Sequence, residues 1–236
     1  MGLFLIKLMP SIIDFSTLHF LSNLKQNNNR EWFALHKEEY LKAQQNMIEI
    51  ADEVIVEMNK HDVLENESGK KCLYRIYSDI RFSKDKSPYN PRFSFRLKRA
   101  TSSRRGGYYV HIEPENSFVA CGFFAPNPED LKRIREDIDY NYEEWFAILN
   151  EPNLVKHYGE MAGMKLATAP KGFPKDHPAI NLIRHKQFIF QSSITDKELQ
   201  SPQIVLIINE KLKAIRPFFD YMSEMLTSNA NGEPII

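Results

Sequence analysis

The sequence predicts an α+β fold: a central, mainly antiparallel sheet flanked by helices, with a long N-terminal helix and a helical C-terminus. Two hydrophobic periods carry this prediction. Apolar residues recur every three or four positions over residues 16–60 and 202–226, the spacing of amphipathic helices. Over residues 92–98 apolar and polar side chains alternate instead, which is typical of a half-buried strand. Because no linker or internal repeat divides the chain, residues 1–236 are predicted to form a single α+β domain.

The N-terminal region is expected to hold two helices. The first covers residues 16–27, with Ser16 or Thr17 as its cap. Asn28, followed three positions later by Glu31, has the pattern of a capping box for a second, long helix that ends near Lys60. The apolar stripe of that helix consists of Trp32, His36, Tyr40, Ala43, Met47, Ile50, Val54 and Met58.

Strand patterns follow in the middle of the chain. Residues 92–98 place Phe93, Phe95 and Leu97 on one face and mainly basic side chains on the other. Residues 108–113 and 117–124 are predicted to be the next strands, joined by the turn residues 114–116, and residues 72–77 and 187–194 are two further candidates. The short connections favour antiparallel pairing.

The second half of the chain is predicted to be mainly helical. Asn127 as a cap, Pro128 in the first turn and the two carboxylates that follow predict the start of a helix. A shorter helix is expected over residues 143–149, and the prolines and glycine of residues 168–178 indicate a loop. A helix over residues 202–226 should kink or break at Pro217, because proline lacks the N–H that a helix interior needs.

Composition excludes several classes of protein. A hydrophobic content of 42% is too high for an intrinsically disordered chain, and 9 Gly with 13 Pro do not make a collagen-like one. The two cysteines, Cys72 and Cys121, are too few for a disulfide scaffold and favour a reducing compartment. No apolar run reaches the roughly 18–20 residues of a membrane-spanning helix. We therefore expect a cytoplasmic protein without a membrane partner.

Charge is distributed unevenly although 31 Lys and Arg balance 31 Asp and Glu. Residues 70–105 hold twelve basic and two acidic residues, a net charge of +10, whereas the remaining 200 residues carry a net charge of −10. Six aromatic residues (Tyr74, Tyr77, Phe82, Tyr89, Phe93 and Phe95) lie among these basic residues. Such a segment suits a phosphate-bearing partner, because the arginine fork matches phosphate oxygens.

The candidate functional site is the loop from Asp79 to Tyr89, where an anion such as a phosphate ester or nucleotide is expected to bind. Asp79 and Asp85 would orient its cations, and with His111 they are the candidate catalytic groups. The expected ligand-binding residues are Arg75, Arg81, Lys84, Lys86 and Tyr89.

His111 and Glu113 stand two residues apart on a predicted strand and therefore share a face. Imidazole titrates near neutral pH, so His111 is a candidate proton donor or acceptor. The pair lacks the further ligands that a metal site requires, because Cys72 and Cys121 are too far apart in the sequence for a Cys-x-x-Cys motif. Neither a metal nor a cofactor is expected.

Three functions are compatible with these residues. The first is an enzyme or binding protein for a phosphorylated small molecule or nucleotide, and the second is a nucleic-acid-binding module that uses the basic segment 70–105. The third is a structural or protein-interaction role, in which acidic residues such as those of 129–139 neutralise the basic segment. The sequence contains no glycine-rich phosphate loop and no nucleophile elbow, and it leaves the oligomeric state open.

Several motifs resemble a bacterial and fungal family known as the domain of unknown function numbered 2461. They are residues 21–33, the most specific stretch 74–89, and then residues 108–114, 134–135, 170–173 and 177–178 in the expected order. One departure is Ser78, where the family pattern has a basic residue. The resemblance covers nearly the whole chain, and it implies no established activity.

Overall fold

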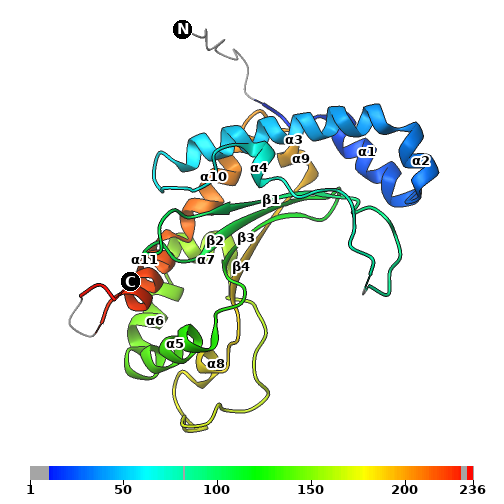
Figure 1. The fold of residues 1–236 in the computed structure, drawn as a ribbon. Helices are drawn as coiled ribbons and strands as arrows, with labels where there is room; N and C mark the ends of the chain where they lie inside the picture. Colours follow the sequence, from blue (N-terminus) through cyan, green and yellow to red (C-terminus); the bar gives the residue numbers. More distant parts are fainter. Residues whose placement is uncertain (1–10, 82, 230–232, 236) are drawn as a thin grey trace.

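The computed structural model describes residues 11–81, 83–229 and 233–235. These residues contain a four-stranded antiparallel sheet in the order β1 (Phe93–Lys98), β2 (Gly107–Ile112), β3 (Ser117–Phe123) and β4 (Phe188–Ile194), drawn in Figure 1. The register pairs Phe95 with Val110, and Val110 with Val119. The predicted α+β class and antiparallel pairing are therefore confirmed.

Helices precede the sheet, separate β3 from β4, and follow β4. Their bounds are α1 Phe15–Gln26, α2 Arg30–Leu35, α3 Lys37–Met58, α4 Gly69–Cys72, α5 Pro128–Tyr140, α6 Tyr142–Leu149, α7 Pro152–Tyr158, α8 Ile180–Ile183, α9 Asp196–Leu199, α10 Ile204–Ala214 and α11 Arg216–Thr227. The long N-terminal helix and the helical C-terminus are thus present.

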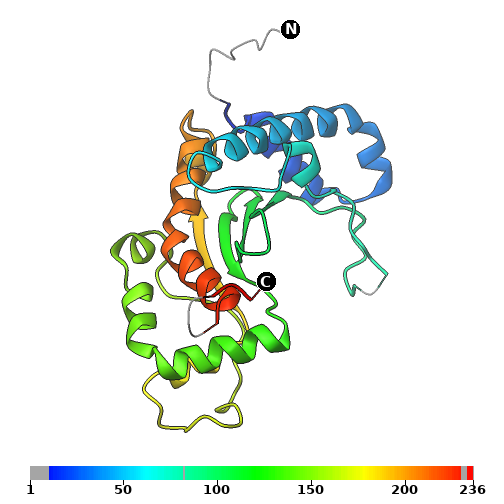
Figure 2. The same ribbon diagram turned by 60° about the vertical axis from the view of Figure 1, so that its left-hand side comes forward.

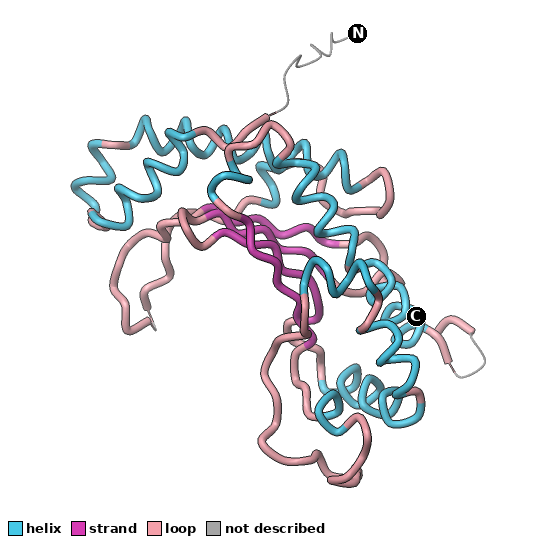
Figure 3. Tube along the Cα trace, turned by 180° about the vertical axis from the view of Figure 1, so that it is seen from behind, coloured by secondary structure: helices cyan, strands magenta, loops and turns pink. Residues whose placement is uncertain are grey.

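The helices cover one face of the sheet. Helices α3, α4 and α10 lie along that face, and α11 continues from α10 at one end (Figures 1 and 2). Side chains that point toward these helices, such as Phe95, Tyr108 and Val110, are fully buried. Seen from behind in Figure 3, the other face has no helix across its middle within the described part of the chain.

The predicted caps of the first two helices are wrong. The residue before α1 is Asp14, and Thr17 donates its hydroxyl to Asn46 Oδ1 over 2.9 Å instead of capping the helix. Asn29, rather than Asn28, caps α2 with its side chain. In both places a side chain that the local pattern assigns to capping is used in a contact between distant segments.

The long helix expected from residue 28 to residue 60 is interrupted at His36. This residue leaves helical geometry, with φ −106° and ψ 23°, and its imidazole stacks on Trp32 with ring centroids 3.9 Å apart. Beyond the break the predicted stripe is confirmed, because its members on α3 are all buried: Tyr40, Ala43, Met47, Ile50, Val54 and Met58.

The strand predicted over residues 72–77 is wrong. The short helix α4 occupies residues 69–72, and the backbone N–H of Gly69 donates to Asp52 Oδ1 of α3 over 2.6 Å. The following residues approach the sheet and the next loop only through isolated bridges at Leu73 and Tyr77. The segment is extended and is bonded at separate points, through Tyr74 N–H to the Ser94 carbonyl and Asn90 N–H to the Ile76 carbonyl, rather than paired along its length.

The elements predicted for the C-terminal half are present, whereas the short helices α7, α8 and α9 were not predicted. Asn127 Oδ1 accepts the backbone N–H of Asp130 over 2.8 Å and so caps α5. The predicted break falls at Ile215, and Pro217 lies in the first turn of α11, where its missing N–H costs nothing.

A buried carboxylate joins the helices to the sheet. Asp62, whose side chain is 0% exposed, accepts from Arg99 Nε over 2.8 Å and from the Tyr108 hydroxyl over 2.6 Å. Arg216 Nη1 lies 3.4 Å from its other oxygen. Burial favours a raised pKa for Asp62, but the hydrogen bonds and these positive charges outweigh it, so the pKa lies below its ordinary value of 3.8.

Replacing Asp62 by Asn should lower the free energy of unfolding by about 3–5 kcal/mol, because the buried Arg99 charge loses its main partner. The matched control is Asp220→Asn, which removes the outer partner of the same guanidinium, at 3.0 Å and half exposed. We expect a loss of at most about 1 kcal/mol there. Urea unfolding followed by circular dichroism measures both, and equal losses would contradict this account.

Candidate functional site

The helix-free side of the sheet, here called the open face, carries the alternate side chains of each strand. Strand β1 and the residue before it contribute mainly basic groups, as the sequence predicts. The open face consists of Arg92, Ser94, Arg96, Lys98, Tyr109, His111, Phe118, Ala120, Ile189, Gln191 and Ser193.

A larger and a smaller pocket adjoin on this face. The larger has a volume of about 660 Å³ and is lined in part by Arg96, Phe124 and Asn127. The smaller, of about 340 Å³, is lined in part by Arg75 and Arg92. Both include Tyr74 and Tyr109, so these two aromatic residues mark where the pockets meet.

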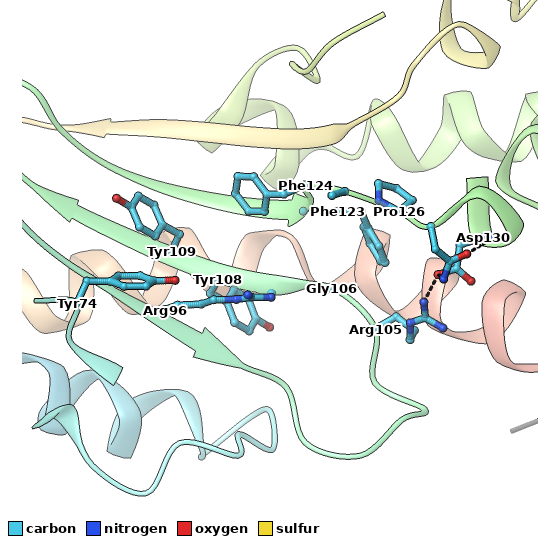
Figure 4. A pocket seen from close by; sticks show the side chains of 14 residues that line it. Tyr74, Arg96, Arg105, Gly106, Tyr108, Tyr109, Phe123, Phe124, Pro126 and Asp130 are labelled. Atoms are coloured by element: carbon cyan, nitrogen blue, oxygen red, sulfur yellow. Dashed lines mark hydrogen bonds and ion pairs between the residues drawn. The ribbon is translucent and has the colours of Figure 1, made fainter. Parts of the chain in front are cut away.

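Figure 4 shows the larger pocket with Tyr74 and Tyr109 at one end, Arg96 between, and an ion pair of Arg105 with Asp130 at the other end. Gly106 also lines this pocket and has a positive φ of 89°. A Cβ there would lie 2.7 Å from the Phe219 ring, so only glycine fits at this position.

The basic segment divides into paired and unpaired cations. Within the described residues, half of its twelve cations form ion pairs: Lys71, Arg81, Lys98, Arg99, Arg104 and Arg105. The other half form none with any described carboxylate: Lys70, Arg75, Lys84, Lys86, Arg92 and Arg96. Three of the unpaired arginines line the two pockets.

The predicted site loop forms an arm, defined as residues 78–88, that extends from the body of the protein (Figure 1). Its described charges bond largely within the arm. Arg81 Nη2 donates to Asp79 Oδ2 over 2.7 Å, which lowers the pKa of Asp79, and Lys86 Nζ donates to the carbonyl of Ile80 over 2.9 Å. Asp85 accepts the backbone N–H of Ser87 over 2.9 Å. Phe82 lies outside the described residues.

Arg75 and Asp79 are the candidates from the arm region that line a pocket, while Arg81, Lys84 and Lys86 are exposed on the arm. Tyr89 is buried at the base of the arm, with its ring 3.9 Å from that of Phe33. The side chain of Asn28 forms hydrogen bonds with both the N–H and the carbonyl of Tyr89, so the start of α2 contacts the base of the arm.

His111 and Glu113 share a face, as predicted. His111 Nε2 lies 3.2 Å from Glu113 Oε2, Nδ1 lies 3.1 Å from the Tyr109 hydroxyl, and Lys25 Nζ lies 2.9 Å from Glu113 Oε1. Burial lowers the pKa of His111, more than its bond to Glu113 raises it. For Glu113 burial works upward, but the bonds from Lys25, Asn116 and His111 outweigh it and lower the pKa.

These directions fix the proton positions at neutral pH. An ionised Glu113 only accepts, so the neutral His111 carries its proton on Nε2. Its bare Nδ1 then accepts from the Tyr109 hydroxyl, which leaves the lone pairs of that oxygen for other donors. Among the described residues, no three His, Cys, Asp or Glu side chains are grouped as a metal ion requires.

A family model described as "Conserved hypothetical protein (DUF2461)" matches residues 16–221. The chain belongs to this family. Neither the curated proteins nor the solved structures gave a match. Within the described ranges, no helix is both long enough and apolar enough to cross a bilayer.

In this DUF2461 chain, the sequence did not predict that one site would include Tyr74, Arg96 and Asn127. Nor did it predict the contact of Lys25 with Glu113. The alternation of residues 92–98 already places Arg92 and Arg96 on the same side of a strand. What the sequence lacks is the strand order that brings Tyr109 beside them, because that depends on contacts between distant segments.

Lowering the pH below about 6.5 should destabilise the fold in part through His111. Its pKa in the folded protein lies below the ordinary 6.5, so below that pH the unfolded chain binds a proton that the folded chain resists. In His111→Gln the free energy of unfolding should therefore fall less steeply, by up to about 1.4 kcal/mol per pH unit.

Urea titrations at pH 7.5, 6.5 and 5.5 measure this slope. Burial also lowers the pKa of His185, so His185→Gln should remove a separate part of the pH dependence. In the double variant the free energy of unfolding should change less with pH than in either single variant. A slope unchanged by His111→Gln would contradict the assignment.

Proposed function

We propose that the open face binds a phosphate-bearing ligand of the phosphate-ester or nucleotide class. The observation that supports this is the placement of Arg75, Arg92 and Arg96 around two joined pockets, where no described carboxylate pairs with them. Cations held together without partners repel one another, and an anionic ligand would relieve that repulsion.

The acids of the pockets do not cancel this charge. Asp79 is bonded by Arg81, and Asp130 by Arg105, so each is already matched. Arg75, Arg92 and Arg96 therefore leave three positive charges for a ligand. Guanidinium groups bind phosphate oxygens in a bidentate manner, which makes a phosphate a better partner than an isolated carboxylate or halide.

Aromatic rings favour a ligand that carries a flat group beside its phosphate. Tyr74 is 50% exposed and Phe124 40%, and both line the larger pocket. Its volume of about 660 Å³ falls within the range of roughly 300–1,000 Å³ typical of small-molecule sites. A base or similar ring can stack on these aromatic side chains, whereas inorganic phosphate cannot.

The arm remains a second proposal for anion contact. Lys84 and Lys86 are exposed and form no ion pair with a described carboxylate, so they would extend the positive surface beyond Arg75. Asp79, Asp85 and His111 stay candidates for catalysis, and binding is the function we propose first. A cytoplasmic location, which the two buried free cysteines favour, also stays a prediction.

AMP should stabilise the protein more than adenosine, because only AMP offers a phosphate to Arg96. At 100 times its dissociation constant AMP should add about 2.7 kcal/mol. For a chain of this size that raises Tm by about 5–10 °C. In Arg96→Ala the Tm shift with AMP should fall to that with adenosine, as measured by thermal unfolding.

Two further variants place the site. Lys70→Ala removes an exposed, unpaired cation of α4 and should leave the AMP shift intact. Arg81→Ala should also leave it intact if the pockets bind AMP, and abolish it if the arm does. An equal shift from AMP and adenosine in the parent protein would refute phosphate recognition.

A further inference from the structure

We propose that the ligand of the open face is a single-stranded nucleic acid that runs through both pockets. This inference rests on the proposed function and narrows its ligand class. The pockets share Tyr74 and Tyr109, with Arg96 in the larger one and Arg75 and Arg92 in the smaller. Cations thus stand on both sides of an aromatic pair.

That alternation matches a repeating ligand better than a single nucleotide. One nucleotide has one phosphate position next to its base and would leave the arginines of the other pocket unpaired. A chain of nucleotides offers phosphates on both sides of a base, so it can engage Arg96 and Arg92 together. Single-stranded binding sites elsewhere combine a basic track with aromatic platforms in this way.

The rings on the open face are available for stacking. Tyr74 and Tyr109 lie with centroids 6.4 Å apart and an interplanar angle of 54°, so their rings are tilted rather than stacked on one another. Phe124 adds a further exposed ring to the lining of the larger pocket. Bases of a duplex are already stacked and paired, so only an unpaired strand can use these rings.

The charged groups around this path are consistent with a polyanion. Glu113 is bonded by Lys25 and His111, so it is paired with basic side chains, as Asp79 and Asp130 are. At the other edge of the open face, the exposed Gln191 and Ser193 of β4 offer neutral donors and acceptors for base edges.

Fluorescence anisotropy with labelled dT8 and U8 tests this inference. Because each phosphate contact in a single strand contributes about −0.7, three arginines predict a slope near −2 for log K against log salt. Tyr74→Ala should weaken binding between about 5-fold and 150-fold, the loss of one stacked base. Tyr74→Phe should bind like the parent, and so should Tyr140→Ala, which removes an exposed ring of α5.

The outcomes separate the inference from the proposed function. If AMP binds as tightly as dT8 and U8, phosphate-ester binding stands and the nucleic-acid inference fails. If neither AMP nor the oligonucleotides bind, both fail. A duplex that binds as tightly as dT8, with Tyr74→Ala unchanged, would overturn the single-stranded assignment. Binding that rises with oligonucleotide length and depends on both Tyr74 and Arg96 supports it.

Discussion

Asp62 is the point on which the arrangement of helices and sheet depends. It follows α3 in the chain, yet it bonds Arg99 after β1, Tyr108 in β2 and Arg216 at the start of α11. Burying a carboxylate is costly, and these donors offset that cost together with the backbone N–H of Val63, 2.8 Å from Asp62 Oδ1. Arg99 in turn donates to the carbonyl of Arg105, so the loop that forms one wall of the larger pocket is held by the same network.

The alternation of side chains along β1 places arginines of the one basic segment on both faces of the sheet. Side chains alternate along β1, so Arg92 and Arg96 point to the open face while Arg99 points to the helices. Arg99 is 2% exposed and fully bonded, whereas Arg96 is exposed. The proposed ligand-binding role therefore does not compete with the structural role of Arg99, because residue parity places Arg99 on one face of the sheet and Arg92 and Arg96 on the other.

Local patterns predicted the elements, and contacts between distant segments decided the site. The strand at 92–98 and the cap Asn127 depend on neighbours in sequence and were predicted correctly. The burial of Tyr89 was not, because it needs Phe33 and Asn28 from a distant segment. The break at His36 was also missed, although the ring that stacks on it, Trp32, is only four residues away. The sequence accordingly pointed to residues 75–89, where basic residues are dense; of these candidates Arg75 and Asp79 line the smaller pocket, whereas Arg96 was not among them.

Density of charge along the chain is a poor guide to charge available in space. In a loop the chain can turn so that neighbouring charges pair with one another, as Asp79 and Arg81 do two residues apart. On a strand, residues two apart point the same way at about 7 Å, and residues four apart at about 13 Å. By this spacing the Cα atoms of Arg96 and of Arg92, directly before β1, are about 13 Å apart. Cations spaced along one face of a strand suit the proposed ligand, whose own charges repeat, better than a ligand with a single phosphate.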